Sequence, residues 1–284
     1  MSERFFIPPD RMLLDPKIDS IFKTIFTQDC EASRIALKGL VTAIIGYEPE
    51  EITVINSETP KDIITAKDIR LDLNCRMSNG EQINIEMQTC LTDSLSLKAR
   101  TAYYGCRLVA GLAMHGRDYD RMPKVYQVMF TNFVLFGGSD FLRRFTFASG
   151  KEELTDKLQI IFVQLPLVAG KENLQELEKW SIFFRDSAEI SKRDVLNRII
   201  CSDLRIQKAA EVLMYVSQEE RERAIAESRL KWKLDYQSDM IIAERKGKLQ
   251  GTLEVAKKML AEGIPDDVIL RVTGLTLEEI RAAD

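Results

Sequence analysis

The sequence has 284 residues, of which 45% are apolar and 30% charged, with a formal net charge of −4 and an isoelectric point of about 5.4. This composition is that of a globular protein, long enough for one large core or a core with an appendage. A protein that depends on tight non-specific DNA binding usually carries a basic excess, so the acidic balance argues mildly against that class and leaves open a nuclease with a local basic rim.

The residue types exclude several kinds of site. No run of about 18 apolar residues, the length of a membrane-spanning helix, occurs, and the first residues lack the apolar core of a secretion signal. We therefore expect a cytoplasmic protein without a membrane span. The five cysteines are odd in number, widely spaced and without a CxxC pair, which argues against a disulfide framework and against a zinc knuckle.

A single histidine, His115, narrows the chemistry further. It disfavours zinc hydrolase sites rich in histidine, Ser-His-Asp triads and His-Asn-His nucleases. His115 precedes Gly116 and lies where a helix is expected to end, which is a position typical of a capping residue. The chemistry must therefore rest on carboxylates, amides, lysines and arginines.

The chain from Asp15 to Ile45 predicts two helices, because apolar residues recur in it at helical spacing and Gly46 follows as a stop signal. Asp19, near the start of this segment, has two interpretations. It is a candidate third acidic group of a catalytic site, or a solvated carboxylate favoured by the dipole at a helix start.

Beyond these helices the apolar period changes to that of a strand. Residues 51–55 predict a short strand, and residues 69–76 and 82–88 alternate between apolar and polar side chains. The Ser-Asn-Gly sequence at 78–80 is a turn signal. The two alternating segments therefore predict a β-hairpin.

The loop length decides which side chains of this hairpin share a face. A two-residue loop would place Asp72 opposite Met87, and a three-residue loop ending at Gly80 would place it opposite Glu86. The longer loop needs a positive φ at its last residue, which glycine supplies. We therefore expect the longer loop, with the Cβ atoms of Asp72 and Glu86 about 5 Å apart. Gln88 then lies on the same face as Glu86.

Two carboxylates at this separation repel each other unless a cation intervenes. Mg²⁺ suits such a pair, since it takes one or two carboxylates, several waters and a phosphate, and it lowers the pKa of a bound water. The amide of Gln88 can orient that water or complete the shell, but it carries no positive charge. The alternative is that Asp72 and Glu86 are ordinary polar residues on the solvent face of a half-buried strand.

Residues 93–114 predict a helix with a polar N-cap. Arg100, Tyr104 and Arg107 fall on one face of this helix. Two guanidinium groups on one face suit a phosphate clamp, and the alternative is that they pair with acidic neighbours. Tyr103 is expected to pack in the core.

Two apolar runs, residues 125–136 and 158–167, predict strands covered on both faces. Together with the hairpin and the flanking helices they predict an α/β fold with a mixed β-sheet.

From residue 171 onward the pattern is helical. Residues 218–261 predict a long helix or two abutting helices, and the last residues predict a helix-turn-helix-like unit. The final helix is acidic at Glu278 and Glu279, which disfavours insertion into a DNA groove. We expect this unit to dock onto the body of the protein or onto a second copy, as a homodimer through the C-terminal helices.

Several of these segments occur in the order found in a known family: Asp19-x-x-Phe22-Lys23-x-x-Phe26, Lys67-Asp-Ile-Arg-Leu-Asp72, Gly80, Asn84-Ile-Glu86-Met-Gln88, Arg100-x-x-Tyr103-Tyr104-x-x-Arg107-Leu108, and Ala256-Lys-Lys-Met-Leu-x-x-Gly263 with Thr273-Gly-Leu-Thr276. Together they resemble the PD-(D/E)xK nuclease family transposases, also called recombination-promoting nucleases. The resemblance is strongest between about residues 10 and 140, where the Asn-Ile-Glu-Met-Gln motif follows a strand bearing Arg-x-Asp.

The resemblance implies a restriction-endonuclease-like nuclease core in residues 1–170 and a helical C-terminal region in residues 171–284. It implies hydrolysis of DNA phosphodiester bonds with Mg²⁺, for which Mn²⁺ substitutes, in recombination or mobile-element biology. Asp72 and Glu86 would be metal ligands within a catalytic set that also holds Gln88 and Asp19. Gln88 would stand where the wider superfamily places lysine.

DNA phosphate contacts are expected from six residues: Arg100, Tyr104, Arg107, Lys98, Lys67 and Arg70. Because Gln88 carries no charge, Lys98 or Lys67 is expected to stabilise charge in the transition state. One alternative function is that of a catalytically weak or inactive protein that keeps the nuclease fold and binds DNA or a partner, which the acidic balance and Gln88 favour. Another is a restriction-type defence nuclease that shares the same site.

Overall fold

The computed structural model describes residues 5–55, 72–91, 93–112, 119–170, 173–219, 228, 240–241, 247–276, 278 and 280. The chain forms two compact units, Met1–Arg229 and Leu230–Asp284. The first unit contains the sheet and most of the helices, and the second contains the terminal helices.

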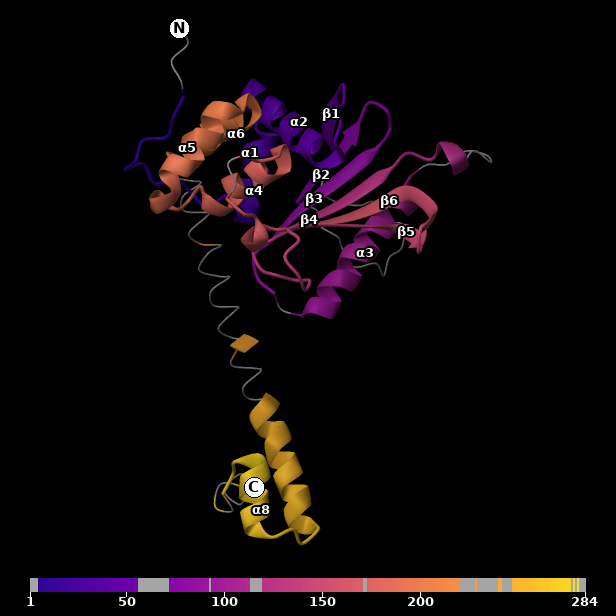
Figure 1. Ribbon diagram of the computed structural model, residues 1–284, viewed down its shortest axis with the longest axis vertical. Coiled ribbons are helices and arrows are strands. Elements are labelled where there is room, and N and C mark those ends of the chain that lie inside the picture. Colours follow the sequence, from indigo (N-terminus) through magenta and orange to yellow (C-terminus); the bar gives the residue numbers. More distant parts are fainter. Residues whose placement is uncertain are drawn as a thin grey trace. The chain divides into compact units, whose positions relative to one another are not determined.

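The first unit is built on one mixed sheet, which confirms the predicted α/β class. Its six strands in the described chain are β1 (Ile52–Ile55), β2 (Leu73–Met77), β3 (Gln82–Gln88), β4 (Val125–Thr131), β5 (Leu142–Ser149) and β6 (Glu152–Gln164). Their spatial order is β1-β2-β3-β4-β6-β5 (Figure 1). β4 is parallel to both β3 and β6, and the other pairs are antiparallel.

Helices cover both faces of this sheet unequally. The helices that the structure describes in this unit are α1 (Asp19–Thr27), α2 (Glu31–Ile45), α3 (Ser94–Ala110), α4 (Glu176–Asp186), α5 (Arg193–Ser202) and α6 (Leu204–Val216), with the short helices η1 (Tyr119–Arg121), η2 (Leu165–Leu167) and η3 (Ile190–Lys192). In Figure 1, α3 lies on one side of the sheet and α1, α2 and α4–α6 lie on the other. We call these the α3 face and the helical-layer face.

Local signals begin and end these helices, and the stop at Gly46 and the polar cap of α3 were predicted from the sequence. Gly46 ends α2 in the left-handed conformation with φ of 87°, which glycine adopts without a Cβ clash. Asp93 caps α3 by accepting from the backbone N–H groups of Leu95 and Ser96. The side chains of Gln175 and Glu178 form a capping box at the start of α4.

The helical-layer face carries the main core of the protein. Apolar side chains at alternate positions of β2, β3, β4 and β6 pack against the five helices in one buried cluster. An aromatic group lies at its centre, where Phe184 meets Phe22, Phe130 and Trp180 at ring-centroid distances of 5.5, 5.2 and 5.8 Å. Burial of this apolar area is the main source of stability.

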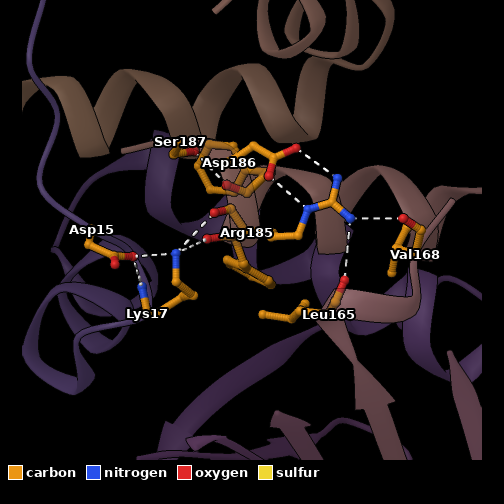
Figure 2. A network of polar contacts seen from close by, with 9 residues as sticks. Asp15, Lys17, Leu165, Val168, Arg185, Asp186 and Ser187 are labelled. Atoms are coloured by element: carbon orange, nitrogen blue, oxygen red, sulfur yellow. Dashed lines mark hydrogen bonds and ion pairs between the residues drawn. The ribbon is translucent and has the colours of Figure 1, made fainter. Parts of the chain in front are cut away.

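Helix α4 is fastened to the rest of this layer at its C-terminal end (Figure 2). Lys17 pairs with Asp15 and donates to the carbonyl oxygen of Arg185 at 3.0 Å, so a cation satisfies carbonyls that the helix end leaves unbonded. Arg185 pairs with Asp186 and donates to the carbonyl of Val168 at 2.8 Å, which joins the end of α4 to the chain that follows β6.

The α3 face has two smaller apolar clusters. Leu108 packs with Val125 and Leu158, and Leu97 packs with Met129 and Phe162. Gly105 faces the sheet between them, and a Cβ there would lie 3.0 Å from the side chain of Leu158 and 3.4 Å from Cβ of Gln127. Glycine at this position therefore lets α3 lie close to β4.

The second unit contains the helix of residues 247–261 and α8 (Asp266–Thr273). Pro265 precedes α8, and Gly274 ends it with φ of 73°, which are a typical helix start and stop. Ala256, Ile269 and Ile280 form a small buried cluster of this unit. Of the long helix predicted over residues 218–261, residues 220–227, 229–239 and 242–246 lie outside the described residues.

Three elements differ from the expectation. β5 was not predicted, because its edge position leaves it largely exposed and its pattern carries little apolar alternation. β4 ends at Thr131 instead of continuing to residue 136, because the buried side chain of Gln164 accepts from the N–H groups of Leu135 and Phe136 and holds them in a loop. β6 starts at Glu152, earlier than expected.

The predicted division after residue 170 also differs from the observed units. Helices α4, α5 and α6 contribute Phe184, Leu196 and Leu213 to the same core as the sheet, so they belong to the first unit. None of the helices that the structure describes is both long and apolar enough to cross a membrane.

Candidate active site

The β2–β3 hairpin has the predicted three-residue loop. Gly80 has φ of 85° and donates to the carbonyl of Met77 at 2.9 Å, and Met77 donates to the carbonyl of Glu81 at 2.8 Å. The last register pair of the two strands is Leu73 with Ile85. Continuing this register by one residue places Asp72 opposite Glu86, as the sequence predicts.

Asp72 is held at the start of β2 by the neighbouring strand. Its Oδ2 accepts from the backbone N–H of Met87 at 3.1 Å. The carboxylate thus occupies a position where a strand carbonyl would otherwise accept, and its orientation is tied to the backbone of β3.

Glu86 is buried at 8% exposure on the α3 face. Its Oε1 accepts from Nδ2 of Asn84 at 2.8 Å and from Nε2 of Gln127 at 3.4 Å. Burial raises the pKa of Glu86 to about 7, and the charge of Asp72 adds to this rise. The amide of Asn84, the charge of Arg100 and the amide of Gln127 lower the pKa against these effects.

Two side chains of α3 reach this site. Nη2 of Arg100 donates to Oε1 of Gln88 at 3.2 Å, and Nε2 of Gln88 donates to the carbonyl of Cys90 at 2.9 Å. Burial raises the pKa of Tyr104, Arg100 lowers it, and the charge of Glu86 raises it, so the phenol also lies within the field of the site. α3 therefore brings a cation and a hydroxyl group to the paired acids.

The donor set fits a hard divalent cation. Glu86 is a buried carboxylate beside a second carboxylate, and an opposite charge is what favours its ionised form. The side-chain Oδ1 of Asn84 is buried and has no hydrogen-bond partner among the described residues, which leaves an oxygen acceptor close to the acids. Carboxylate and amide oxygens are the ligands that Mg²⁺ and Mn²⁺ prefer.

The described residues contain no group of three or more His, Cys, Asp or Glu side chains placed to hold a metal ion. Asp19 lies in the first turn of α1 and is not part of such a group with Asp72 and Glu86, and its catalytic role stays a prediction. A cation at this site would take two protein carboxylates, and its remaining ligands would be water and substrate, as is usual for Mg²⁺.

The other predicted site residues are placed as follows. Lys98 lies over the ring of Phe136, with 4.7 Å between Nζ and the ring centroid, and it makes this cation–π contact in place of one with the acids. Arg107 follows Tyr104 by about one turn of α3, and the helix places it on the same face as Arg100. Lys67, Arg70 and His115 lie outside the described residues.

The prediction for Tyr103 was wrong. Its side chain is 52% exposed, and its ring lies 6.1 Å from that of Tyr104. The buried stripe of α3 runs through Leu97, Thr101 and Leu108, and Tyr103 lies off this stripe.

Sequence reasoning gave no role to two amides that contact Glu86. Asn84 appeared in the sequence analysis only as part of the family motif, although its position two residues before Glu86 puts both side chains on one face of the strand. Gln127 was missed, and its signal was a polar residue in the middle of the apolar run of β4. A buried glutamine requires hydrogen-bond partners, which is the reason to look for a site around it.

Two family profiles match the chain. The profile of the PD-(D/E)XK nuclease family transposases matches residues 16–243, and that of the C-terminal HTH domain of the Rpn/YhgA-like nuclease family matches residues 249–284. No curated protein and no solved structure matched the chain. The first match spans more than half of the sequence and includes the whole β2–β3 hairpin. The chain therefore belongs to the PD-(D/E)XK nuclease family transposases and carries the C-terminal HTH domain of Rpn/YhgA-like nucleases.

Proposed function

We propose that this protein is a divalent-metal-dependent endonuclease that hydrolyses phosphodiester bonds of DNA, as a transposase or recombination-promoting nuclease. The observation that carries the proposal is the pairing of Asp72 with a buried Glu86 whose pKa is raised to about 7. A carboxylate is rarely kept in such a place without a cation or a proton, and such sites are candidates for catalysis.

Each residue of the site has a role in this proposal. Asp72 and Glu86 hold the cation, which is Mg²⁺ or its substitute Mn²⁺. When bound, the cation lowers the pKa of a water and polarises the scissile phosphate. Tyr104 and Arg107, both half-buried on α3, contact the DNA backbone in this proposal, since a hydroxyl and a guanidinium suit phosphate oxygens.

Arg100 takes over the positive charge that the wider superfamily places on lysine. Its guanidinium binds the amide oxygen of Gln88, so the charge lies next to the side chain that replaces the lysine. Lys98, the other described candidate, is engaged over Phe136 instead. Arg100 can therefore stabilise charge that develops on the phosphate.

The second unit assists DNA engagement in this proposal. An HTH domain in the same chain as a nuclease core would help to hold the enzyme on DNA, although acidic residues near the C-terminus disfavour deep insertion into a groove. Association of two copies through the C-terminal helices remains a prediction, and sedimentation of the full chain at several concentrations tests it.

Nicking of supercoiled plasmid by the purified full chain tests the catalytic proposal. With Mg²⁺ or Mn²⁺ we expect nicked and linear DNA, and with EDTA we expect neither. Asp72→Asn and Glu86→Gln should abolish the product, while Glu152→Gln, at an exposed carboxylate at the start of β6, should cut normally. Cleavage that survives both active-site substitutions would remove the proposed site.

One observation favours a second candidate, a DNA- or partner-binding protein with a weak or inactive nuclease site. The oxygen of the Gln88 amide accepts a hydrogen bond from Arg100, and its nitrogen donates one to the carbonyl of Cys90. The amide is therefore already hydrogen-bonded within the protein, at the position where the wider superfamily has a catalytic lysine. This candidate predicts DNA binding without cleavage and without a Mn²⁺ binding isotherm in calorimetry.

A further inference from the structure

We propose that Gln127 is a positioning residue for Glu86: together with Asn84 it holds Oε1 of the carboxylate and so leaves Oε2 as the oxygen offered to the cation. This inference rests on the proposed function, because it concerns the same site. It adds Gln127 to the site, a residue that is 41 positions from Glu86 in the sequence and lies on the neighbouring strand of the sheet.

The place of Gln127 in the sheet is unusual for its side chain. It is the third residue of β4, between Tyr126 and Val128, and is fully buried. The parallel register sets it directly opposite Asn84 on β3, on the face that α3 covers. Burial of an amide is unfavourable unless its polar atoms are bonded, so this position is explained only by its partners.

Three side chains close a ring of hydrogen bonds. Nδ2 of Asn84 donates to Oε1 of Glu86 at 2.8 Å and to Oε1 of Gln127 at 3.0 Å, and Nε2 of Gln127 donates to Oε1 of Glu86 at 3.4 Å. Nδ2 of Asn84 donates both to Glu86 and to Oε1 of Gln127, so the two amides fix each other's orientation. A change at Gln127 therefore affects both donors to Glu86.

The two donors bind the same carboxylate oxygen. Among the described residues, no hydrogen bond engages Oε2 of Glu86. A carboxylate with one oxygen held by two amides cannot rotate freely, so its second oxygen keeps a fixed direction. Groups of this kind behind a metal ligand commonly change metal affinity about 10–100-fold when they are removed.

The chain contains a matched control for a purely structural role. Gln164 on β6 is also fully buried and also faces α3's side of the sheet, since it pairs with Thr131, which lies four residues along β4 from Gln127. Its partners are backbone atoms of a loop: the N–H groups of Leu135 and Phe136 and the carbonyl of Asp140. Loss of Gln164 should therefore reduce stability without changing the site.

Calorimetric titration of the full chain with MnCl₂, without DNA, is the test, with thermal unfolding followed in parallel. Gln127→Met, which keeps the volume of the side chain but removes the amide, should weaken Mn²⁺ binding about tenfold or more. Gln164→Met should lower the melting temperature and leave the Mn²⁺ affinity of the folded protein unchanged. Gln127→Asn, which is polar but one methylene shorter, provides a second variant if the first does not fold, and should weaken binding in the same way.

The outcomes separate the two proposals. Wild-type Mn²⁺ affinity in a folded Gln127→Met or Gln127→Asn protein, with binding lost in Glu86→Gln, would overturn the positioning role and leave the metal site standing. Absence of Mn²⁺ binding by the wild-type chain would overturn both.

Discussion

The two faces of the sheet carry opposite chemistry on the same strands. Ile85 of β3 and Val128 of β4 point into the core under the helical layer, while their neighbours Glu86 and Gln127 point toward α3. The first face is apolar and covered by α1, α2 and α4–α6, and the second holds buried amides and a carboxylate beside two small apolar clusters under α3.

This difference separates what stabilises the fold from what the site requires. Alternation along a strand means that a shift in register by one residue would exchange the two faces, so the apolar face fixes the position of the polar one. The polar face adds little stability of its own, since its bonded amides only offset the loss of water and Glu86 remains unfavourable. We therefore expect substitutions on the two faces to affect different measurements.

The largest effect on stability is expected on the helical-layer face. Phe184→Ala removes a fully buried ring from the aromatic group with Phe130 and Trp180, and should lower the free energy of unfolding by about 3–5 kcal/mol. Urea denaturation measures it. Phe147→Ala, at a ring that is 46% exposed on β5, should have a much smaller effect, and equal losses would contradict the comparison.

On the α3 face, one substitution should raise stability. The pKa of Glu86 is raised from 4.5 to about 7. Between pH 4.5 and pH 7, the folded metal-free protein therefore keeps a proton on Glu86 that the unfolded chain has lost. Stability from this group is complete below pH 4.5 and is lost as pH rises through 7. Glu86→Gln should therefore stabilise the metal-free protein at pH 8, by on the order of 3 kcal/mol, and little at pH 5.

Melting temperatures of the wild type and Glu86→Gln across pH 5–8 check this sign. Glu152→Gln, at an exposed carboxylate, is the control and should follow the wild type. A wild-type melting curve that does not change between these pH values, once metal is removed, would show that Glu86 carries no such penalty.

The sequence predicted the parts of this arrangement that depend on local chemistry. Gly80 fixed the loop length, and with it the register that places Asp72 opposite Glu86. Alternation placed Gln88 on the same face as Glu86, and helical spacing placed Arg100 with Tyr104. Each of these depends on residues close together in the chain.

The remaining parts depend on pairings between distant segments. The contact of Gln127 with Glu86 follows from the parallel register of β3 and β4, which no local signal sets. Lys98 is only two residues from Arg100, but that step is more than half a turn of a helix, and it directs the amine to Phe136. Sequence reasoning therefore predicted the pair of acids, and left open their positioning partners and whether Arg100 or Lys98 carries the positive charge beside them.

The next test of the α3 face asks whether Arg100 or Lys98 supplies the positive charge of the site. Arg100→Met removes the charge beside Gln88, and should reduce DNA cleavage by about 10–100-fold, since hydrogen bonds to charged groups contribute about 1.5–3 kcal/mol. Arg100→Lys should recover part of the rate, because it restores charge without the planar geometry. Arg198→Met on α5, on the opposite side of the sheet, is the matched control.

Single-turnover cleavage of a plasmid separates these variants. A normal rate for Arg100→Met, together with a large loss for Lys98→Met, would move the catalytic charge to Lys98.

The smallest effect on stability should come from the contact that brings α3 to the sheet. In Gly105→Ala the added Cβ would meet the end of the Leu158 side chain at 3.0 Å and Cβ of Gln127 at 3.4 Å. The gain in helix propensity, about 1 kcal/mol, should nearly offset this crowding, so the melting temperature should change little. The rate of DNA cleavage should fall although the melting temperature changes little, because a small displacement of α3 moves Arg100 away from Gln88. Gly247→Ala, where a Cβ meets nothing within 4 Å, should change neither cleavage nor the fold of the first unit, and equal activity in the two variants would show that the site does not depend on how closely α3 packs.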